Sequence, residues 1–138
     1  KFKIREQGAP VAKGATEAVA LHPSSVNSAL ARFETPYCAY AEKLKTGQVY
    51  LRDTTPASPY ALMLFGGALG RKDGVLSVDG WIKFRVPKAV EDLVMGIRVQ
   101  LDGLLCQKIE NPDLALSDAG QSVLGAVHAL LDTPLPRC

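Results

Sequence analysis

Two runs of alternating apolar and polar residues flank a short basic turn in the first half of the chain. Residues 37–44 and 49–55 are rich in Tyr, Val and Leu, and Lys45, Thr46 and Gly47 lie between them. β-Branched and aromatic residues on both sides of a glycine-containing turn are typical of a β-hairpin. Cations and aromatic residues are neighbours throughout this segment, which makes it the first candidate for a binding surface.

Two earlier segments are also predicted to be strands. Residues 2–7 and 17–21 alternate in the same way. The second run ends at His22-Pro23, because proline cannot donate to a strand ladder.

A further hairpin is predicted beyond the middle of the chain. Residues 75–78 and 81–86 flank Asp79-Gly80, a dipeptide that favours a tight turn because both positions tolerate positive φ. If this turn has two residues, one face of the hairpin carries Trp81, Lys83 and Arg85.

Three helices are expected from their start and stop signals. Ser58-Pro59 suits the start of a short helix, and Gly66-Gly67 is predicted to end it through a left-handed cap. A long helix with apolar residues at three- and four-residue spacing runs from Pro87 to Asn111-Pro112, and a last helix follows Ser117.

These elements predict a mainly β fold. Six short strands with a helix inserted before the last hairpin suggest a small closed or nearly closed barrel of five to six strands, with helices at the C-terminal end. We expect a barrel domain over residues 1–112 and a helical extension over residues 113–138.

The charge of the chain is unevenly distributed. The 138 residues have a net charge of +2, but residues 1–88 hold 13 Lys and Arg against 7 Asp and Glu (+6), and residues 89–138 hold 3 against 7 (−4). A basic, strand-rich part is the footprint expected for a phosphate-bearing partner, although ordinary surfaces often show a similar imbalance. No apolar run approaches the roughly 18 residues that span a bilayer, so no membrane association is expected.

The three cysteines do not suggest a disulfide framework or a zinc site. Cys38, Cys106 and Cys138 are odd in number and far apart. Cys38 and Cys106 lie among apolar residues and are predicted to be buried free thiols, which favours an intracellular location.

Sequence signals for catalysis and metal binding are missing. No phosphate-binding loop and no acidic helicase box is present, and His22 and His128 are isolated. We therefore expect no catalytic residue, no metal ligand and no cofactor in this chain. Because it begins in the middle of a strand pattern, we expect it to be part of a larger protein.

Five motifs, taken in order, give the chain a family resemblance. They resemble the C-terminal OB-fold domain of DEAH/RHA-type (DExH-box) ATP-dependent RNA helicases over about residues 1–112. The motifs are His22-Pro23-Ser24-Ser25-Val26, Tyr37-x-x-Tyr40-x-Glu42-Lys43-x-Lys45-Thr46, Tyr50-x-Arg52-Asp53-x-Thr55, Leu62-x-Leu64-Phe65-Gly66-Gly67 and Val78-Asp79-Gly80-Trp81-Ile82-Lys83-Phe84.

The resemblance implies an accessory OB-fold domain that binds and guides single-stranded or structured RNA beside the helicase core and modulates its ATPase. ATP and Mg²⁺ would then act in the core of the parent protein, not in this chain. Other domains of the same helicase and a protein activator are the further partners implied, in the nucleus or the cytoplasm. The rival hypothesis is a protein-docking module that makes no direct contact with RNA.

Eight residues are candidates for contact with RNA. OB folds bind single strands through a basic groove with aromatic platforms, so the basic and hydroxyl side chains of the hairpins and loops are selected. The candidates are Lys43, Lys45, Thr46, Arg52, His22, Ser24, Ser25 and Lys83.

Each candidate also has a structural interpretation. The cations of the first hairpin can pair with Glu42 and Asp53, and the loop serines can cap a turn. Lys83 and Arg85 would lie across from Leu76 and Val78, where their stems can cover apolar surface.

Overall fold

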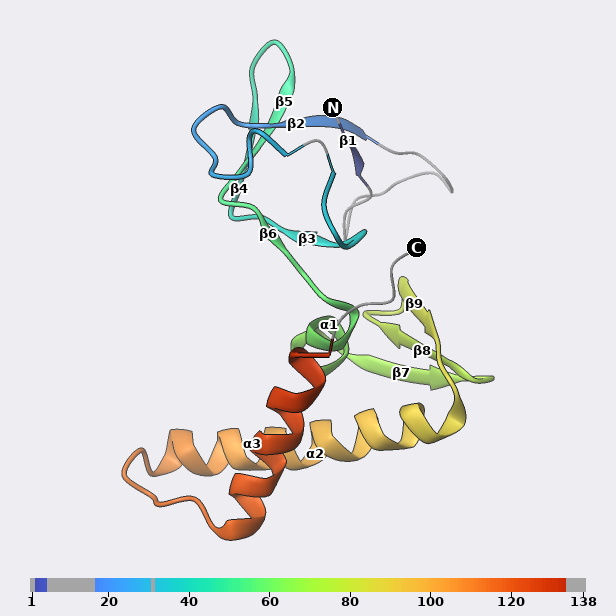
Figure 1. The fold of residues 1–138 in the computed structure, drawn as a ribbon, viewed down its shortest axis with the longest axis vertical. Coiled ribbons are helices and arrows are strands. Elements are labelled where there is room, and N and C mark those ends of the chain that lie inside the picture. Colours follow the sequence, from blue (N-terminus) through green and yellow to red (C-terminus); the bar gives the residue numbers. More distant parts are fainter. Residues whose placement is uncertain (1, 5–16, 31, 134–138) are drawn as a thin grey trace. The chain divides into compact units, whose positions relative to one another are not determined.

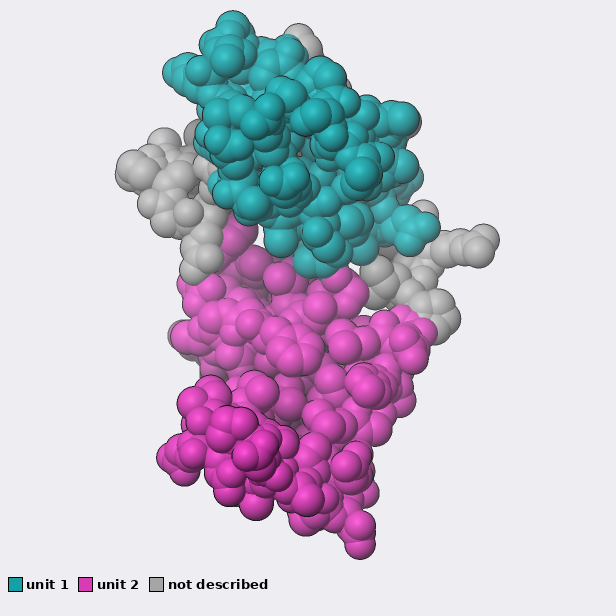
Figure 2. Space-filling view, turned by 90° about the vertical axis from the view of Figure 1, so that its left-hand side faces the viewer, with its two compact units in different colours: residues 1–57 teal, residues 58–138 magenta. Residues whose placement is uncertain are grey.

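The computed structural model describes residues 2–4, 17–30 and 32–133. The chain forms two compact units, unit 1 over residues 1–57 and unit 2 over residues 58–138, which Figure 2 colours separately. Among the described elements, unit 1 contains strands only, whereas unit 2 combines three strands with three helices.

Unit 1 is built on a four-stranded sheet (Figure 1). Its order is β1 (Phe2–Ile4), β2 (Glu17–Leu21), β5 (Val49–Arg52) and β4 (Glu42–Lys45). Strands β2 and β5 run parallel, and the outer two pairs are antiparallel. β5 therefore has a hydrogen-bonded neighbour on each side.

The predicted first hairpin is confirmed, with an interruption. β4 pairs with β5 in a register that sets Glu42 opposite Arg52. The two-stranded sheet of β3 (Cys38–Ala39) and β6 (Thr55–Pro56) continues the same register, with Cys38 opposite Pro56. Asp53 adopts a φ of 50° between β5 and β6, which breaks the ladder into two segments of one long hairpin.

The core of unit 1 lies on one face of its sheet. Val19, Leu21, Val49 and Leu51 are buried together, and Phe33 packs against them. Because side chains alternate along a strand, Tyr50 and Arg52 point to the opposite face.

Unit 2 contains a three-stranded antiparallel sheet. Its strands are β7 (Leu69–Lys72), β8 (Val75–Val78) and β9 (Ile82–Arg85), with β8 in the middle. The predicted turn is confirmed, since Asp79 and Gly80 have φ values of 49° and 74°. Asp73-Gly74 makes the preceding turn in the same way, with φ values of 51° and 72°, and β7 before it was not predicted.

The register of the second hairpin differs from a two-residue turn. Val78 lies opposite Ile82, so three residues connect the strands. Lys83 therefore lies opposite Ser77, and Arg85 lies opposite Val75. The prediction that these two cations lie across from Leu76 and Val78 is wrong, because one extra residue in the turn moves each side chain to the other face.

All three predicted helices are present. They are α1 (Pro59–Phe65), α2 (Lys88–Glu110) and α3 (Asp118–Leu131). α1 contacts β8, α2 and α3, and α3 packs across α2 (Figure 1). The predicted boundary after residue 112 lies inside unit 2, between α2 and α3.

The buried residues of α2 follow the apolar spacing that predicted the helix. Val94, Ile97 and Leu101 are buried, and Glu91 is buried with them. The Glu91 carboxylate forms an ion pair with Arg71 of β7, which also pairs with Asp92 at 3.0 Å. A buried carboxylate is costly unless it is paired, so Arg71 fixes β7 to α2.

The end of α1 is held by a close approach rather than by a left-handed cap. Gly66 has a φ of −67°, so the predicted left-handed conformation is wrong. A Cβ atom at Gly66 would lie 2.7 Å from a methyl carbon of Val78. Arg98 of α2 donates to the carbonyl oxygens of Met63, Gly66 and Gly67 at 3.0, 2.6 and 2.6 Å, which satisfies the free carbonyl groups of the helix end.

No closed barrel is formed by the described strands. They make a four-stranded, a two-stranded and a three-stranded sheet, each with open edges. The closed barrel of five to six strands stays a prediction. In the part of the chain that the structure describes, no helix has the length and apolar character needed to cross a membrane.

We predict that Gly66→Ala destabilises the protein by about 1–3 kcal/mol, because the added methyl group overpacks the junction of α1 and β8. The control is Gly103→Ala on α2, where an added Cβ meets nothing within 4 Å. It is expected to stabilise the helix by up to about 1 kcal/mol. Urea denaturation followed by circular dichroism measures both changes, and equal midpoints for the two variants would contradict the close-packed junction.

Candidate nucleic-acid interface

The tip of the first hairpin presents an unpaired cation. Lys45 is the last residue of β4, and the turn Thr46-Gly47-Gln48 follows it. Lys45 is exposed, and its side chain forms no ion pair or hydrogen bond with any residue that the structure describes. The Thr46 amide donates to the Gln48 carbonyl oxygen at 3.0 Å, which fixes the turn.

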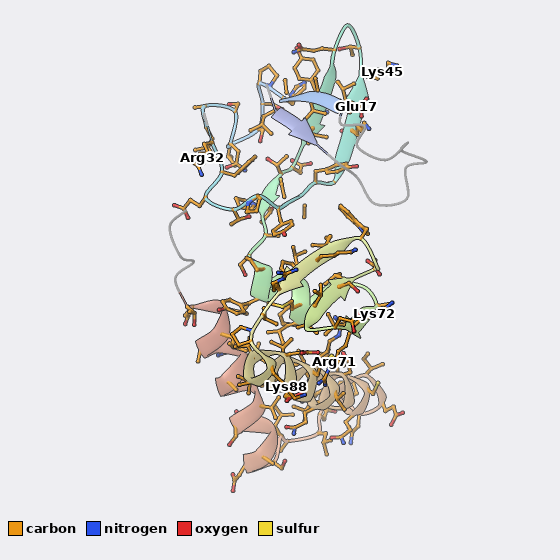
Figure 3. The ribbon with its side chains drawn as sticks, turned by 90° about the vertical axis from the view of Figure 1, so that its right-hand side faces the viewer. Glu17, Arg32, Lys45, Arg71, Lys72 and Lys88 are labelled. Carbon is orange, nitrogen blue, oxygen red and sulfur yellow. The ribbon has the colours of Figure 1, made fainter. Side chains whose placement is uncertain are left out.

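A small pocket lies beside this turn. Residues 17–20 of β2 and residues 45–49 of the hairpin line it. Lys45 lies opposite Val49 in the ladder, so its side chain shares the face of the buried Val19 and Val49. Figure 3 labels Lys45 and Glu17 in this part of unit 1. The lining of the pocket thus includes the apolar Val19 and Val49 and two charged residues, Lys45 and Glu17.

Lys43 shares this face but is neutralised. Its Nζ lies 2.5 Å from Oε2 of Glu17 on β2. The two side chains reach toward each other from the strands that flank β5. The pair joins β2 to β4, and a phosphate at Lys43 would have to compete with the Glu17 carboxylate.

Arg52 is held on the opposite face of the sheet by neighbours on both sides. Its Nη1 lies 3.5 Å from Oε2 of Glu42 on β4, and its Nη2 lies 3.4 Å from Nε2 of His22 after β2. Among the described residues its carboxylate partner is therefore Glu42 and not Asp53. Arg52 connects three strands, which is the structural role considered for it.

His22 and Ser24 bind each other. His22 Nδ1 lies 2.6 Å from Ser24 Oγ, and the His22 ring meets Tyr50 edge-on with centroids 5.7 Å apart. Both ring nitrogens of His22 thus already have polar neighbours within the chain. The exposed Ser24 hydroxyl lies at the surface of this loop.

Ser25 is a buried anchor of the same loop. It is 9% exposed, and its hydroxyl lies 3.5 Å from that of Thr54. Asn27 reinforces this connection by donating from Nδ2 to the Thr54 carbonyl oxygen at 2.6 Å. The loop after β2 is therefore fastened to the chain between β5 and β6.

Lys83 belongs to unit 2, apart from the other candidates. It is exposed on β9, whereas Trp81 before it is half-buried in the turn and is not an open stacking platform. Seven of the eight predicted residues thus lie in unit 1. Lys43 and Lys45 lie on one face of its sheet and Arg52 lies on the other, whereas the remaining four lie in the hairpin turn and in the loop after β2.

The sequence interpretation missed two features of these surfaces. Glu17 was not identified as the ion-pair partner of Lys43. The two residues are far apart in the sequence, and no local sequence pattern indicates that their strands lie close together. Lys72 was missed because β7 was missed, although Asp73-Gly74 repeats the turn signal recognised at Asp79-Gly80.

Neither the cysteines nor the acidic residues build a reactive centre in the described part of the chain. No group of three His, Cys, Asp or Glu side chains is placed there to hold a metal ion. Cys38 is half-buried, and burial raises the pKa of its thiol, which lowers its reactivity. Cys106 is exposed, so the prediction that it is buried is wrong.

Comparison with known proteins gives two family matches. Residues 4–69 match the family described as the oligonucleotide/oligosaccharide-binding (OB)-fold. Residues 74–133 match the family described as the C-terminal domain in RNA helicases. The first match ends at Leu69, the first residue of β7, and the second covers β8, β9, α2 and α3.

Full-length relatives agree with these matches. The chain is 40% identical over 116 residues to the DExH-box ATP-dependent RNA helicase DExH1 of Arabidopsis thaliana, which covers 82% of the chain and 12% of that protein. It is 39% identical over 123 residues to the ATP-dependent DNA/RNA helicase DHX36 of Mus musculus, with 83% and 12% covered. It is 41% identical over 118 residues to the putative ATP-dependent RNA helicase DHX57 of Homo sapiens, with 79% and 8% covered.

The chain spans about a tenth of the length of these relatives. The OB-fold match over residues 4–69, the RNA-helicase match over residues 74–133 and full-length relatives of one kind lead to a single assignment. The resemblance seen in the sequence motifs is confirmed, and the chain belongs to the family of C-terminal OB-fold regions of DExH-box RNA helicases.

Proposed function

We propose that this chain binds and guides single-stranded or structured RNA beside the core of a DExH-box helicase, and that it modulates the ATPase of that core. One observation carries the proposal: Lys45 is exposed at the tip of a fixed turn and has no partner among the described residues. Its neighbours Lys43 and Arg52 are paired with carboxylates. A phosphate can therefore approach Lys45 without displacing an existing ion pair.

The binding mode that follows is contact with the backbone of the RNA. Lys45 supplies a point charge, and Thr46 and Ser24 supply exposed hydroxyl groups. Such contacts position a strand but carry little sequence information, so weak sequence preference is expected. Lys43, His22 and Arg52 support the sheet, and Ser25 anchors the loop.

The remaining chemistry is assigned to the parent protein. Because the relatives are ATP-dependent helicases of which this chain matches about a tenth, we propose that ATP, Mg²⁺ and hydrolysis belong to other domains of the helicase, inside the cell. These domains, with a protein activator, are the further partners proposed.

A second candidate function is docking onto those domains. Leu105 and Ile109, one turn apart on α2, are 47% and 78% exposed, so they form a small apolar surface on this helix. A surface of this kind fits the apolar side of another domain of the same helicase. RNA contact would then be incidental.

We predict that Lys45→Gln weakens RNA binding. Titration of labelled oligouridylate at several salt concentrations should give a several-fold higher Kd at low salt. The slope of log Kd against log salt should become shallower by about 0.7, the share of one phosphate contact on a single strand. Lys88→Gln is the control, because it removes the same charge from a residue that pairs with Asp92 on unit 2. Identical slopes for the two variants would refute the Lys45 site.

We predict that Arg52→Gln changes stability more than binding. Arg52 contacts Glu42 and His22, so its loss removes a cross-strand pair at a partly exposed position, worth about 0.2–1 kcal/mol. A double-mutant cycle with Glu42→Gln measures this coupling by urea denaturation. If Arg52→Gln instead weakens oligouridylate binding as much as Lys45→Gln and leaves stability unchanged, Arg52 is a ligand and not a support.

A further inference from the structure

The outer face of the sheet in unit 2 collects three cations. Side chains alternate along each strand, so Lys72 of β7, Val75 of β8 and Arg85 of β9 share one face in register. Lys83 joins them two residues before Arg85 on β9. Lys72, Lys83 and Arg85 are all exposed, and we call these three residues the sheet cations.

The opposite face of the same sheet is the core of unit 2. Leu76 and Phe84 lie opposite each other in the ladder and are buried, as is Val78. Helix α1 contacts β8, and Arg71 extends from β7 to Glu91 and Asp92 of α2. The helices therefore pack on the apolar face, and the sheet cations lie on the other one.

The sheet cations differ from the nearby basic residues in being unpaired. Arg71 and Lys88 are neutralised by Glu91 and Asp92 at α2, where Figure 3 labels them. None of the sheet cations forms an ion pair or hydrogen bond with a residue in the described ranges.

The acidic residues that are nearest in sequence to the sheet cations lie in the turns between the strands. Asp79 accepts a hydrogen bond from the Ala68 amide at 2.8 Å, and Asp73 lies in the turn after Lys72. No acidic residue lies within the three strands themselves. The face is therefore positive along its strands.

The spacing of the sheet cations suits a chain of phosphates. Lys83 and Arg85 are about 7 Å apart along one strand, and Arg85 and Lys72 are about 10 Å apart across two strand spacings. Gly70, Val75 and Ser77, the residues between them, have small or short side chains. The ammonium and guanidinium groups of the sheet cations are therefore not screened by larger side chains between them. An extended polyanion can contact several of these groups together.

We infer that this face is a second RNA-backbone contact surface, separate from the turn at Lys45. The inference rests on the proposed function, because it assigns the same ligand, RNA, to a surface of unit 2. It adds Lys72 and Arg85 to Lys83, which was already a predicted contact. RNA rather than an acidic peptide is the proposed ligand, because its backbone carries one negative charge on every nucleotide and a single strand can therefore contact several exposed cations of this face together.

The test combines the three substitutions Lys72→Gln, Lys83→Gln and Arg85→Gln in the chain of residues 1–138. Titration with a labelled 20-nucleotide oligouridylate should show a slope of log Kd against log salt that is shallower by about 2, from three contacts of about 0.7 each. Lys83→Gln alone should change it by about 0.7. Lys88→Gln should leave the slope unchanged, and thermal denaturation should give the same Tm for all variants, because the substituted side chains are exposed.

The outcomes separate this inference from the proposed function. The inference is overturned if the triple variant has the same salt slope as Lys88→Gln while Lys45→Gln has a shallower one. The proposed contact at Lys45 then stands. If the triple variant has the shallower slope and Lys45→Gln does not, the surface on unit 2 is supported and Lys45 is not an RNA contact. Wild-type protein that binds no oligouridylate at low salt overturns both. If polyglutamate binds the wild type as tightly as RNA and the triple variant loses both, the face recognises acidic polypeptides and the inference is wrong.

Discussion

The register of the strands, together with the carboxylates within reach, determines what the described basic residues of the sheets can do. On β4, Lys43 and Lys45 are two residues apart and share a face, yet only Lys43 reaches the Glu17 carboxylate. On β7, Arg71 and Lys72 are adjacent and point to opposite faces, so Arg71 meets the buried Glu91 and Lys72 points away from it. The register therefore divides the cations into paired supports of the fold and unpaired groups at the surface.

Contacts within the fold explain why several positions of the sequence motifs need not touch RNA. Arg52 lies between Glu42 and His22, and Ser25 is buried against Thr54. The same holds in unit 2, where Arg98 binds the end of α1 and a Cβ atom at Gly66 would collide with Val78. These residues join strands, loops and helices, so their substitution is expected to appear first as a loss of stability.

Local signals in the sequence predicted the elements better than their partners. The positive-φ turn at Asp79-Gly80, the Ser58 cap and the apolar spacing of α2 depend on neighbouring residues, and these features were predicted correctly, although the length of the turn was not. The same turn signal at Asp73-Gly74 was overlooked, and with it β7 and Lys72. Contacts such as Lys43 with Glu17 or Arg98 with Gly66 depend on distant segments, so no local pattern could indicate them. The residues predicted to lie across from Lys83 were wrong for a different reason. One additional residue in a turn shifts the register, so each side chain after the turn lies opposite a different residue.

Separation of paired from unpaired cations has a consequence for the energetics of binding. A phosphate that approaches Lys43 or Arg71 must displace a carboxylate, and at Arg71 it would leave Glu91 buried without its counter-charge, which costs several kcal/mol. A phosphate that approaches Lys45 or Lys72 displaces only water and counterions, so the release of counterions is gained in full. Binding through such residues is weak for each contact and strongly dependent on salt. Such binding would leave the fold unchanged when an RNA strand arrives or departs, which fits the proposed role of an accessory RNA-binding surface.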